Sequence, residues 1–370
     1  MTNTSSGPVT RLGIIGVGQI GQRHLDTYRT IPGAEVVAIC GRRESQVQEV
    51  AGRYGILRAY TDYRQLLDQL DIEAVDVCLH NQLHRPVTIA ALDAGKDVYC
   101  EKPMAGTYAD AEAMLNASKR TGRRLAIQLM SLFYENNRAA RLVIEQGWLG
   151  RIYHASSTGF RRRGRPFVDG YGTADFVQKK TAAGGAVYDT GVYHIASMLH
   201  LLDNPTVERI SGQIYQETEM DPARRAQSGY DVEEMGTGLI RLAGGVSLNI
   251  FEAWAAHLDQ YPGSYLLGSQ GGIRLDPFGV FRSLGDLDLN CSVSLADMTW
   301  RLKNVRCEGD TMDGPQQHWI ASLQGRAVPI PTAELALNTM LISEGIYLSS
   351  RLGREVSAEE VRHMSVAQAE

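Results

Sequence analysis

The sequence predicts an α/β protein with a doubly wound parallel sheet at the N-terminus, followed by an α+β domain on a large, mostly antiparallel open sheet. Its 370 residues exceed the roughly 150 expected of one domain. Apolar strand patterns alternate with helical patterns up to about residue 126, and β-branched, alternating segments dominate beyond it. We therefore expect domains at 1–126 and 127–370, with the small, polar residues 1–10 as a disordered tail.

Short apolar runs in the first domain are typical of buried parallel strands. We expect strands at Leu12–Val17, Val36–Cys40, Ala74–Leu79 and Val98–Cys100. Helical periodicity lies between them, at Gln19–Thr30, Glu44–Tyr54, Tyr63–Leu70, Pro86–Ala94 and Tyr108–Arg120. Gly55, Gly95 and Gly122 follow three of these helices, where a left-handed cap residue is common.

The second domain begins with a predicted helix, Asn137–Gln146, which ends at Gly147. Alternating segments then predict strands at Arg151–Phe160, Val207–Tyr215, Thr237–Leu242 and Val246–Trp254. Gly244-Gly245 between the last two indicates a hairpin. A last helix is expected at Ala333–Ser350, closed by Gly353.

Composition excludes several classes of protein. The chain is 44% hydrophobic and 21% charged, as in ordinary globular proteins, and its net charge of −5 offers no general attraction for nucleic acid. No apolar stretch reaches the ~18 residues of a membrane span, and the N-terminus lacks a secretory signal pattern. Five scattered cysteines without a Cys-x-x-Cys pair favour the reducing cytoplasm, and the histidines form no metal motif.

A glycine-rich turn follows the first predicted strand directly. It reads Gly16-Val17-Gly18-Gln19-Ile20-Gly21 and opens a helical pattern. In this motif the first glycine permits a tight turn, the second lets backbone approach a pyrophosphate, and the third allows close helix–strand packing. The free N–H groups of the helix N-terminus attract the phosphates. The turn, including Gln19 and Ile20, therefore predicts a dinucleotide-binding Rossmann domain.

The end of the second strand bears on the choice of cofactor. An acidic residue there would bind the ribose 2′-hydroxyl of NAD(H), but this chain has Gly41-Arg42-Arg43. Two guanidinium groups suit a 2′-phosphate, so NADP(H) is favoured over NAD(H). The alternative is an arginine that stacks on the adenine and accepts either cofactor.

Glu101-Lys102-Pro103, after the last N-terminal strand, makes the pattern specific. With the glycine turn it resembles the glucose–fructose oxidoreductase/inositol dehydrogenase (Gfo/Idh/MocA) family. Further matches are Asn81, His84, the segment 91–96 and the Gly-Gly…Asp-x-Gly element at 184–191. The resemblance implies an open sheet domain that shapes a sugar pocket, and a homodimer or homotetramer built through that sheet. It also assigns Asn81, His84 and Glu101 to cofactor binding.

The resemblance gives Lys102 contact with both the nicotinamide and the substrate hydroxyl, with Asp189 as its acidic partner. The family usually has histidine four residues after that aspartate, where this chain has Tyr193, with His194 next. On a regular helix Tyr193 would lie about 40° from Asp189 and His194 about 140°, so His194 would point elsewhere unless the helix is distorted. A phenol is a poor base unless a cation such as Lys102 lowers its pKa. Both residues remain candidates for proton transfer and substrate contact.

Other residues carry weaker indications. The basic segment 161–166 could hold an acidic sugar through Arg163, or it could be a solvated loop. Lys179 matches a family lysine that contacts substrate or supports the loop. Trp254 and His257 would line the pocket or pack in the sheet, and His318 and Trp319 are expected to be structural.

The sequence thus predicts a cytoplasmic NAD(P)-dependent oxidoreductase acting on a secondary hydroxyl or ketone of a sugar, cyclitol or sugar derivative. Hydride would pass between substrate and nicotinamide, while Lys102 and Asp189, with Tyr193 or His194, transfer the proton. Two alternatives stay open. One is redox-neutral glycoside cleavage or epimerisation through a transient ketone. The other is a dinucleotide-binding sensor or scaffold without turnover, favoured only by the tyrosine at position 193.

Overall fold

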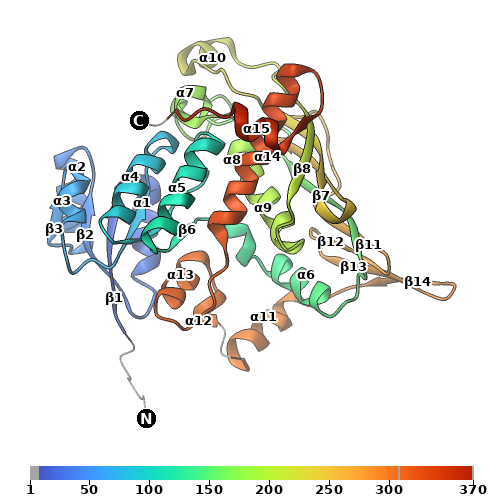
Figure 1. The fold of residues 1–370 in the computed structure, drawn as a ribbon, viewed down its shortest axis with the longest axis horizontal. Helices are drawn as coiled ribbons and strands as arrows, with labels where there is room; N and C mark the ends of the chain where they lie inside the picture. Colours follow the sequence, from blue (N-terminus) through green and yellow to red (C-terminus); the bar gives the residue numbers. More distant parts are fainter. Residues whose placement is uncertain (1–7, 307–308, 369–370) are drawn as a thin grey trace.

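The computed structural model describes residues 8–306 and 309–368 and contains two sheets with helices between them (Figure 1). The first sheet has six parallel strands in the order β3-β2-β1-β4-β5-β6. They are β1 (Thr10–Ile15), β2 (Ala34–Cys40), β3 (Arg58–Tyr60), β4 (Ala74–Val77), β5 (Asp97–Cys100) and β6 (Leu125–Ile127). This is the Rossmann order, and its reversal between β1 and β4 creates the crevice where dinucleotides bind. The expectation of a doubly wound parallel sheet is confirmed.

Helices cover both faces of this sheet: α1 (Gln19–Tyr28), α2 (Glu44–Tyr54), α3 (Tyr63–Leu67), α4 (Asn81–Asp93) and α5 (Tyr108–Thr121). Gly55 and Gly122 are left-handed caps, as predicted. The predicted start of α4 was wrong, because the helix begins five residues before Pro86 and tolerates the proline in its interior. The expected tail was also too long. Thr10 is buried and opens β1, while residues 1–7 lie outside the described residues.

The second sheet has nine strands in the order β14-β13-β12-β11-β7-β10-β9-β8-β15. They are β7 (Ile152–Phe160), β8 (Val207–Tyr215), β9 (Met235–Leu242), β10 (Val246–Ala253), β11 (Tyr265–Gly268), β12 (Gly272–Arg274), β13 (Gly279–Leu284), β14 (Leu287–Cys291) and β15 (Val356–Ser357). All neighbours are antiparallel except β7 and β10. The predicted hairpin joins β9 to β10 through Gly244 and Gly245, both at positive φ.

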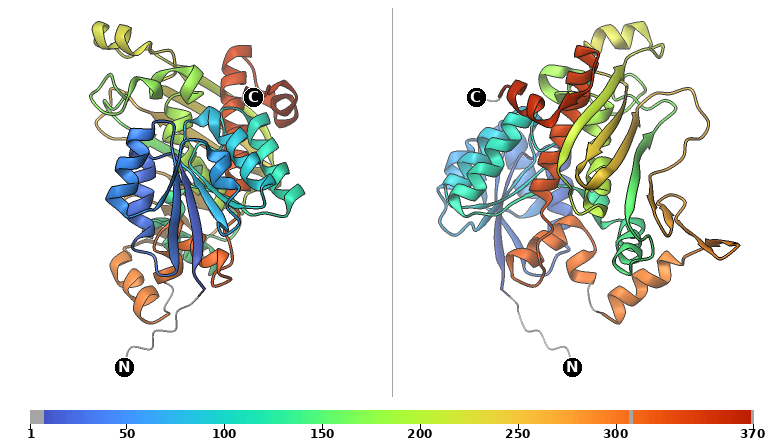
Figure 2. Two further views of the ribbon diagram at one scale, coloured as in Figure 1. Left: turned by 90° about the vertical axis from the view of Figure 1, so that its left-hand side faces the viewer. Right: turned by 45° about the vertical axis from the view of Figure 1, so that its right-hand side comes forward.

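Helices of the second domain fill the space between the two sheets and leave the far face of the nine-stranded sheet open (Figures 1 and 2). Near the first sheet lie α7 (Lys179–Ala182), α8 (Ala186–Asp189), α9 (Gly191–Leu201) and α14 (Thr332–Leu352). The remaining helices are η1 (Met130–Phe133), α6 (Glu135–Glu145), η2 (Ala174–Val177), α10 (Pro222–Ser228), η3 (Ala243–Gly245), α11 (Leu295–Asn304), α12 (Gly309–Met312), α13 (Pro315–Leu323) and α15 (Ala358–Met364). Because α14 contacts β8 on one side and α5 and β6 on the other, it joins the sheets.

The hydrophobic core runs through both parts of the chain. One cluster includes Val77 and Cys100 from the first sheet together with Val187 and Leu341 from the second domain. On the other face of the first sheet, Trp319 of α13 packs beside Leu12 and Ile14. Since late segments pack on the early sheet, the domain boundary at residue 126 stays a prediction. The shared core fixes the carboxyl ends of the parallel strands against α8 and α9.

Candidate active site

The turn after β1 has the geometry that a bound pyrophosphate needs. Gly16 has φ +108°, and a Cβ on it would lie 2.1 Å from the carbonyl oxygen of Cys78. A Cβ on Gly21 would lie 1.9 Å from the carbonyl oxygen of Gly16, so α1 packs closely on β1. Gly18, by contrast, borders open space and caps α1 without a side-chain hydrogen bond. The first N–H groups of α1, from Gln19 and Ile20, thus face a surface that a phosphate can approach.

The end of β2 places two guanidinium groups beside this turn. Gly41 packs closely on Val17, where a Cβ would come within 2.7 Å of the valine side chain. Arg42 and Arg43 are exposed, and Arg43 donates to the side-chain oxygen of Gln46 at 2.9 Å. Gln46 also donates to the carbonyl oxygen of Val17 in the turn. The arginines are therefore available to an anion at the ribose end of a dinucleotide.

Lys102 and Asp189 meet across the junction of the two sheets. Lys102 follows β5, Asp189 ends α8, and the lysine Nζ lies 2.9 Å from Asp189 Oδ1 and 3.0 Å from the Asp189 carbonyl oxygen. The side chains are 15% and 25% exposed. The structure thus brings together two residues that are 87 positions apart in the chain.

Lys102 and Asp189 each stabilise the charged form of the other. Burial lowers the pKa of the Lys102 ammonium, but Asp189 outweighs this effect, and the net pKa lies above its usual value. Burial likewise raises the pKa of Asp189, and Lys102 reverses that shift to a value below the usual one. Lysine and aspartate are therefore both charged at neutral pH.

The segment after Asp189 is not one regular helix. α8 ends at Asp189, Thr190 joins the helices with helical angles of φ −89° and ψ −34°, and α9 starts at Gly191, so the expected direction of His194 relative to Asp189 stays a prediction. Tyr193 packs its ring on Lys102, with the ammonium 4.7 Å from the ring centroid. Burial raises the pKa of Tyr193 to about 12, and the charge of Lys102 lowers that pKa, as expected, but by less than burial raises it.

The partner of His194 is Glu252 of β10. The histidine Nδ1 is 2.9 Å from Oε2 of the buried Glu252, and the histidine side chain is 36% exposed. Glu252 lies in β10, and Trp254 directly follows that strand. Trp254 Nε1 donates to Asp189 Oδ2 at 3.2 Å, so this end of β10 supplies one partner for the imidazole and one for the carboxylate.

Glu252 and Gly159 are site residues that sequence reasoning missed. Burial lowers the pKa of His194, but Glu252 outweighs burial and raises the net pKa above its usual value. Gly159 on β7 pairs with Glu252, and a Cβ there would come within 2.5 Å of the His194 ring. A glycine opposite the glutamate leaves the room that the imidazole occupies, and neither residue lies in a recognisable motif.

The residues around the Glu-Lys-Pro segment hold its backbone. Glu101 accepts a hydrogen bond from the Lys102 N–H at 3.0 Å. His84 is fully buried, with its ring nitrogens 2.8 Å from the Pro103 carbonyl oxygen and 3.1 Å from that of Leu79. Asn81 donates to the Ala182 carbonyl oxygen in α7. His84 and Asn81 thus hold loops around the site, and direct contact with a cofactor stays a prediction.

The basic loop has both exposed and buried arginines, and the expected contact of Arg163 with a substrate stays a prediction. Arg163 is 75% exposed and lies 3.8 Å from Asp169. Arg165 is buried between Asp169 and Glu234 and holds the loop in place. The charge of Arg161 adds to that of Lys102 in lowering the pKa of Asp189, and it opposes protonation of His194. Arg161 itself donates to the Gly164 carbonyl oxygen and to the hydroxyl of Tyr171.

Lys179, Trp254 and His257 complete the expected set. Lys179 is exposed, with its Nζ 5.9 Å from the ring centroid of Tyr347. Trp254 is fully buried and orients Asp189, whereas His257 is exposed. Another missed residue, Glu233, accepts hydrogen bonds from the N–H groups of Gly185 and Val187 and so fixes the turn that starts α8.

A Rossmann sheet with a glycine-rich turn, joined to a nine-stranded sheet whose helix α8 brings Asp189 to Lys102, is the fold of dinucleotide-dependent oxidoreductases. The family model "Oxidoreductase family, NAD-binding Rossmann fold" matches residues 10–129, and "GFO/IDH/MocA C-terminal domain" matches residues 137–274. The chain belongs to the Gfo/Idh/MocA family of NAD-binding oxidoreductases.

Individual relatives span much of the chain. D-glucoside 3-dehydrogenase of Escherichia coli K12 is 28% identical over 360 residues, 94% of this chain and 97% of that protein. Inositol 2-dehydrogenase of Salmonella typhimurium is 35% identical over 157 residues, 40% of this chain and 47% of that protein. D-apiose dehydrogenase of Paraburkholderia graminis is 24% identical over 353 residues, 94% of this chain and 89% of that protein.

Solved structures share the fold. An NAD-binding protein from Listeria innocua superposes with a TM-score of 0.73 at 21% identity, covering 96% of this chain and 99% of that one. Levoglucosan dehydrogenase in complex with NADH and L-sorbose gives a TM-score of 0.74 at 20% identity, covering 95% and 99%. None of the helices formed by residues 8–306 and 309–368 combines the length and apolarity that a bilayer crossing requires.

Proposed function

We propose that this protein is a nicotinamide-dependent dehydrogenase or reductase acting on a secondary hydroxyl or ketone of a sugar, a cyclitol or a derivative of one. The observation that carries the proposal is the charged pair of Lys102 and Asp189. Lys102 follows β5, at the edge of the sheet where the glycine turn also lies. The relatives support the substrate class, since their names include glucoside, inositol and apiose dehydrogenases.

The described residues fit a dinucleotide at the turn. A phosphate can meet Gly18 without displacing protein atoms, and the N-terminus of α1 supplies N–H donors. When bound, the nicotinamide supplies the chemistry of hydride exchange at its C4 carbon. The ammonium of Lys102 then donates a hydrogen bond to the substrate oxygen and stabilises the negative charge that develops there during oxidation. Asp189 and Trp254 hold the ammonium in position.

The hydroxyl proton needs an acceptor, and two side chains compete for this role. The phenol of Tyr193 keeps its proton at neutral pH, because burial raises its pKa to about 12. His194 binds Glu252 through Nδ1, which leaves Nε2 as the acceptor. In oxidation the C–H bond breaks with its electron pair leaving as hydride, and the O–H proton passes to His194. We therefore propose His194 as the base and Tyr193 as a packing partner of Lys102.

We propose NADP(H) as the preferred cofactor, supported by the two exposed arginines at the end of β2 and the lack of a carboxylate at 41–43. Titration of both dinucleotides at matched salt tests this preference. Tighter NADP(H) binding that falls by about tenfold in Arg42→Ala or Arg43→Ala is expected, whereas tighter NAD(H) binding would contradict it.

We also propose a homo-oligomer formed through the open face of the nine-stranded sheet, in the cytoplasm. Exposed apolar side chains such as Tyr153, Leu239 and Leu267 lie on its strands, and a hollow of about 600 Å³ is lined by residues of β8, β9 and β10. The four cysteines among the described residues are free, which fits a reducing compartment. A monomeric mass in light scattering would contradict the oligomer.

The decisive assay follows the absorbance of reduced nicotinamide with a panel of sugars, cyclitols, uronates and glycosides. Stoichiometric reduction of dinucleotide by one of them is expected. Product formation with no net change in absorbance would indicate the redox-neutral alternative. Dinucleotide binding without turnover on any substrate of the panel would contradict the proposal and favour a sensor or scaffold.

A further inference from the structure

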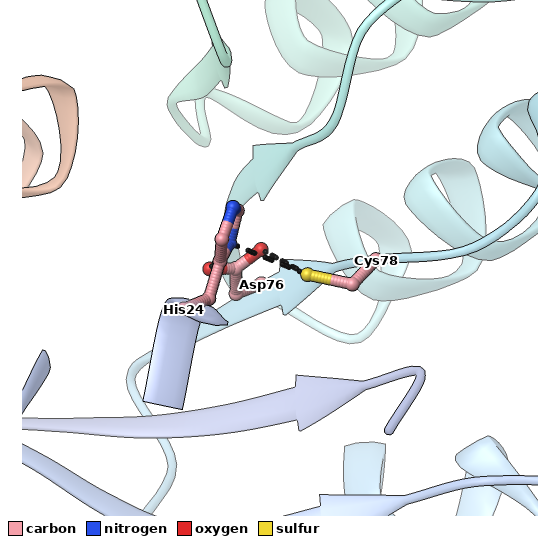
Figure 3. A group of neighbouring side chains, drawn as sticks. All are labelled: His24, Asp76 and Cys78. Atoms are coloured by element: carbon pink, nitrogen blue, oxygen red, sulfur yellow. Dashed lines mark hydrogen bonds and ion pairs between the residues drawn. The ribbon is translucent and has the colours of Figure 1, made fainter. Parts of the chain in front are cut away.

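A buried polar cluster lies directly behind the Glu101–Lys102 segment. His24 of α1, Asp76 of β4 and Cys78 just beyond β4 point toward one another (Figure 3). His24 Nδ1 is 2.8 Å from Asp76 Oδ2, and its Nε2 is 2.9 Å from Glu101 Oε1. The side chains of His24, Asp76 and Glu101 are 5%, 0% and 13% exposed. Because these side chains are buried, water has little access to the two contacts between His24 and the carboxylates.

The geometry requires an extra proton in this cluster. A neutral imidazole has one N–H and can donate to one carboxylate only, so its other nitrogen would direct a lone pair at the second carboxylate. Both ring nitrogens of His24 face carboxylate oxygens at hydrogen-bond distance. A doubly protonated ring satisfies both contacts and neutralises one of the two buried negative charges.

Glu101 connects His24 to the backbone of Lys102. One oxygen of its carboxylate contacts His24, and the other accepts the backbone N–H of Lys102 at 3.0 Å. The carboxylate is thus held from both sides, and so is the peptide that carries Lys102. The side chain of that lysine ends 2.9 Å from Asp189. His24 also lies on α1, whose N-terminus forms the dinucleotide turn.

We propose that His24, held as a buried imidazolium between Asp76 and Glu101, is a positioning residue that fixes the Lys102 ammonium relative to the dinucleotide turn. The inference rests on the proposed function for its effect on turnover, but not for the charge state of His24. The neighbouring thiol is a spectator, since burial raises the pKa of Cys78 and keeps it protonated.

A metal ion is the competing explanation for such a group of side chains. The nitrogen that would bind it, Nδ1, is 2.8 Å from Asp76 Oδ2, whereas two ligands of a tetrahedral zinc lie about 3.3 Å apart. The same nitrogen is 3.3 Å from the protonated sulfur of Cys78. Hydrogen bonds therefore already account for the arrangement.

The charge state is tested first, by nitrogen chemical shifts of histidine-labelled protein, with His24 assigned from the His24→Gln variant. Both ring nitrogens should remain protonated at about pH 8.5, two units above the ordinary histidine pKa. A neutral His24 ring at that pH would overturn the proposal. Zinc bound at one ion per chain in the purified protein would overturn it as well.

Kinetics then test the positioning role. His24→Gln keeps one donor but loses the charge, and Glu101→Gln keeps an acceptor for the Lys102 N–H. In each variant kcat should fall about 10- to 100-fold, the cost of a small misplacement, while the dinucleotide Kd changes less than about threefold. His318→Gln is the matched control. His318 is also buried and bonded to backbone, but in α13, so kcat should be unchanged.

The outcomes separate this inference from the proposed function. If the wild type turns over and His24→Gln matches His318→Gln in kcat, the positioning role is refuted while the function stands. Loss of dinucleotide binding in parallel with kcat would also refute it, because the histidine would then support the turn as a whole. If the wild type has no activity on the substrate panel, the proposed function fails, and the chemical shifts still decide the charge state of His24.

Discussion

Replacing Asp189 by asparagine tests the acid–base pair with little change in shape. Asp189→Asn removes the charge that lies 2.9 Å from the Lys102 ammonium and keeps an oxygen that can accept from Trp254. Asp189 holds the ammonium that stabilises the developing negative charge, and loss of such a positioned donor costs about 10²- to 10³-fold, so kcat/KM should fall by that range. Breaking a fully buried pair costs about 3–5 kcal/mol, and these side chains are 15% and 25% exposed, so we expect a loss of about 1–3 kcal/mol.

The pH dependence of the same variant has a definite sign. The folded-state pKa of Lys102 is raised, so its stabilisation is complete below its unfolded pKa of ~10.4 and is lost as pH rises through the folded value. The folded-state pKa of Asp189 is lowered, so its contribution is lost only as pH falls through that value. Without the carboxylate, the main group that opposes burial is lost and the pKa of Lys102 falls. The basic limb of the rate profile should therefore move to lower pH.

The assay is kcat/KM against pH, with urea unfolding at neutral pH for stability. Asp286→Asn serves as the control, because Asp286 is exposed in the turn between β13 and β14 and should leave both quantities unchanged. A kcat/KM for Asp189→Asn within about threefold of wild type, with an unshifted basic limb, would refute the reasoning.

Four further variants probe other parts of the account. Gly18→Ala should weaken dinucleotide binding about tenfold or more and leave thermal stability unchanged, since the added Cβ would meet no protein atom and would lie where the ligand binds. Gly21→Ala should lower the melting temperature, because its Cβ would lie 1.9 Å from a backbone oxygen. Equal effects of the two variants on binding and on melting temperature would contradict this reasoning. Glu252→Gln should lower the pKa of His194 and move the acidic limb of the oxidation rate to lower pH; an unmoved limb would remove His194 as the base. Glu234→Gln takes a carboxylate from the buried guanidinium of the basic loop and should cost about 3–5 kcal/mol in urea unfolding; a loss below 1 kcal/mol would indicate that water reaches the pair.

The nucleotide-binding half could be predicted because its signals are local. Gly16 and Gly21 are required by a positive φ and by a close backbone contact, which follow from a short run of sequence. The buried strands produce apolar runs that end in such turns. β3 and β6 were missed because each has only three residues, which is too short to show the hydrophobic pattern of a strand.

The other half of the site depends on pairing between distant strands. Glu252 faces Gly159 because β10 lies parallel to β7, and 93 residues separate the two positions in the chain. No local pattern encodes that register. The contact of His194 with Glu252 has no local signal either, because it joins α9 to β10 across 58 positions of the chain.

The meeting of Lys102 and Asp189 was expected from the family resemblance and not from spacing. Periodicity locates each residue at the end of an element, but only the packing of the two sheets brings those ends within hydrogen-bond distance. What the resemblance did not supply is the support around them, namely Trp254 on the carboxylate and Glu101 on the lysine backbone.

The most direct test of the central claim compares turnover with cofactor binding in Lys102→Ala. Because the lysine contacts Asp189 and Tyr193 and lies outside the glycine turn, its loss should abolish hydride transfer while the dinucleotide Kd stays within about threefold of wild type. Wild-type turnover in this variant would remove the lysine from the chemistry. A parallel loss of dinucleotide binding would show that it serves the cofactor site and not the reaction.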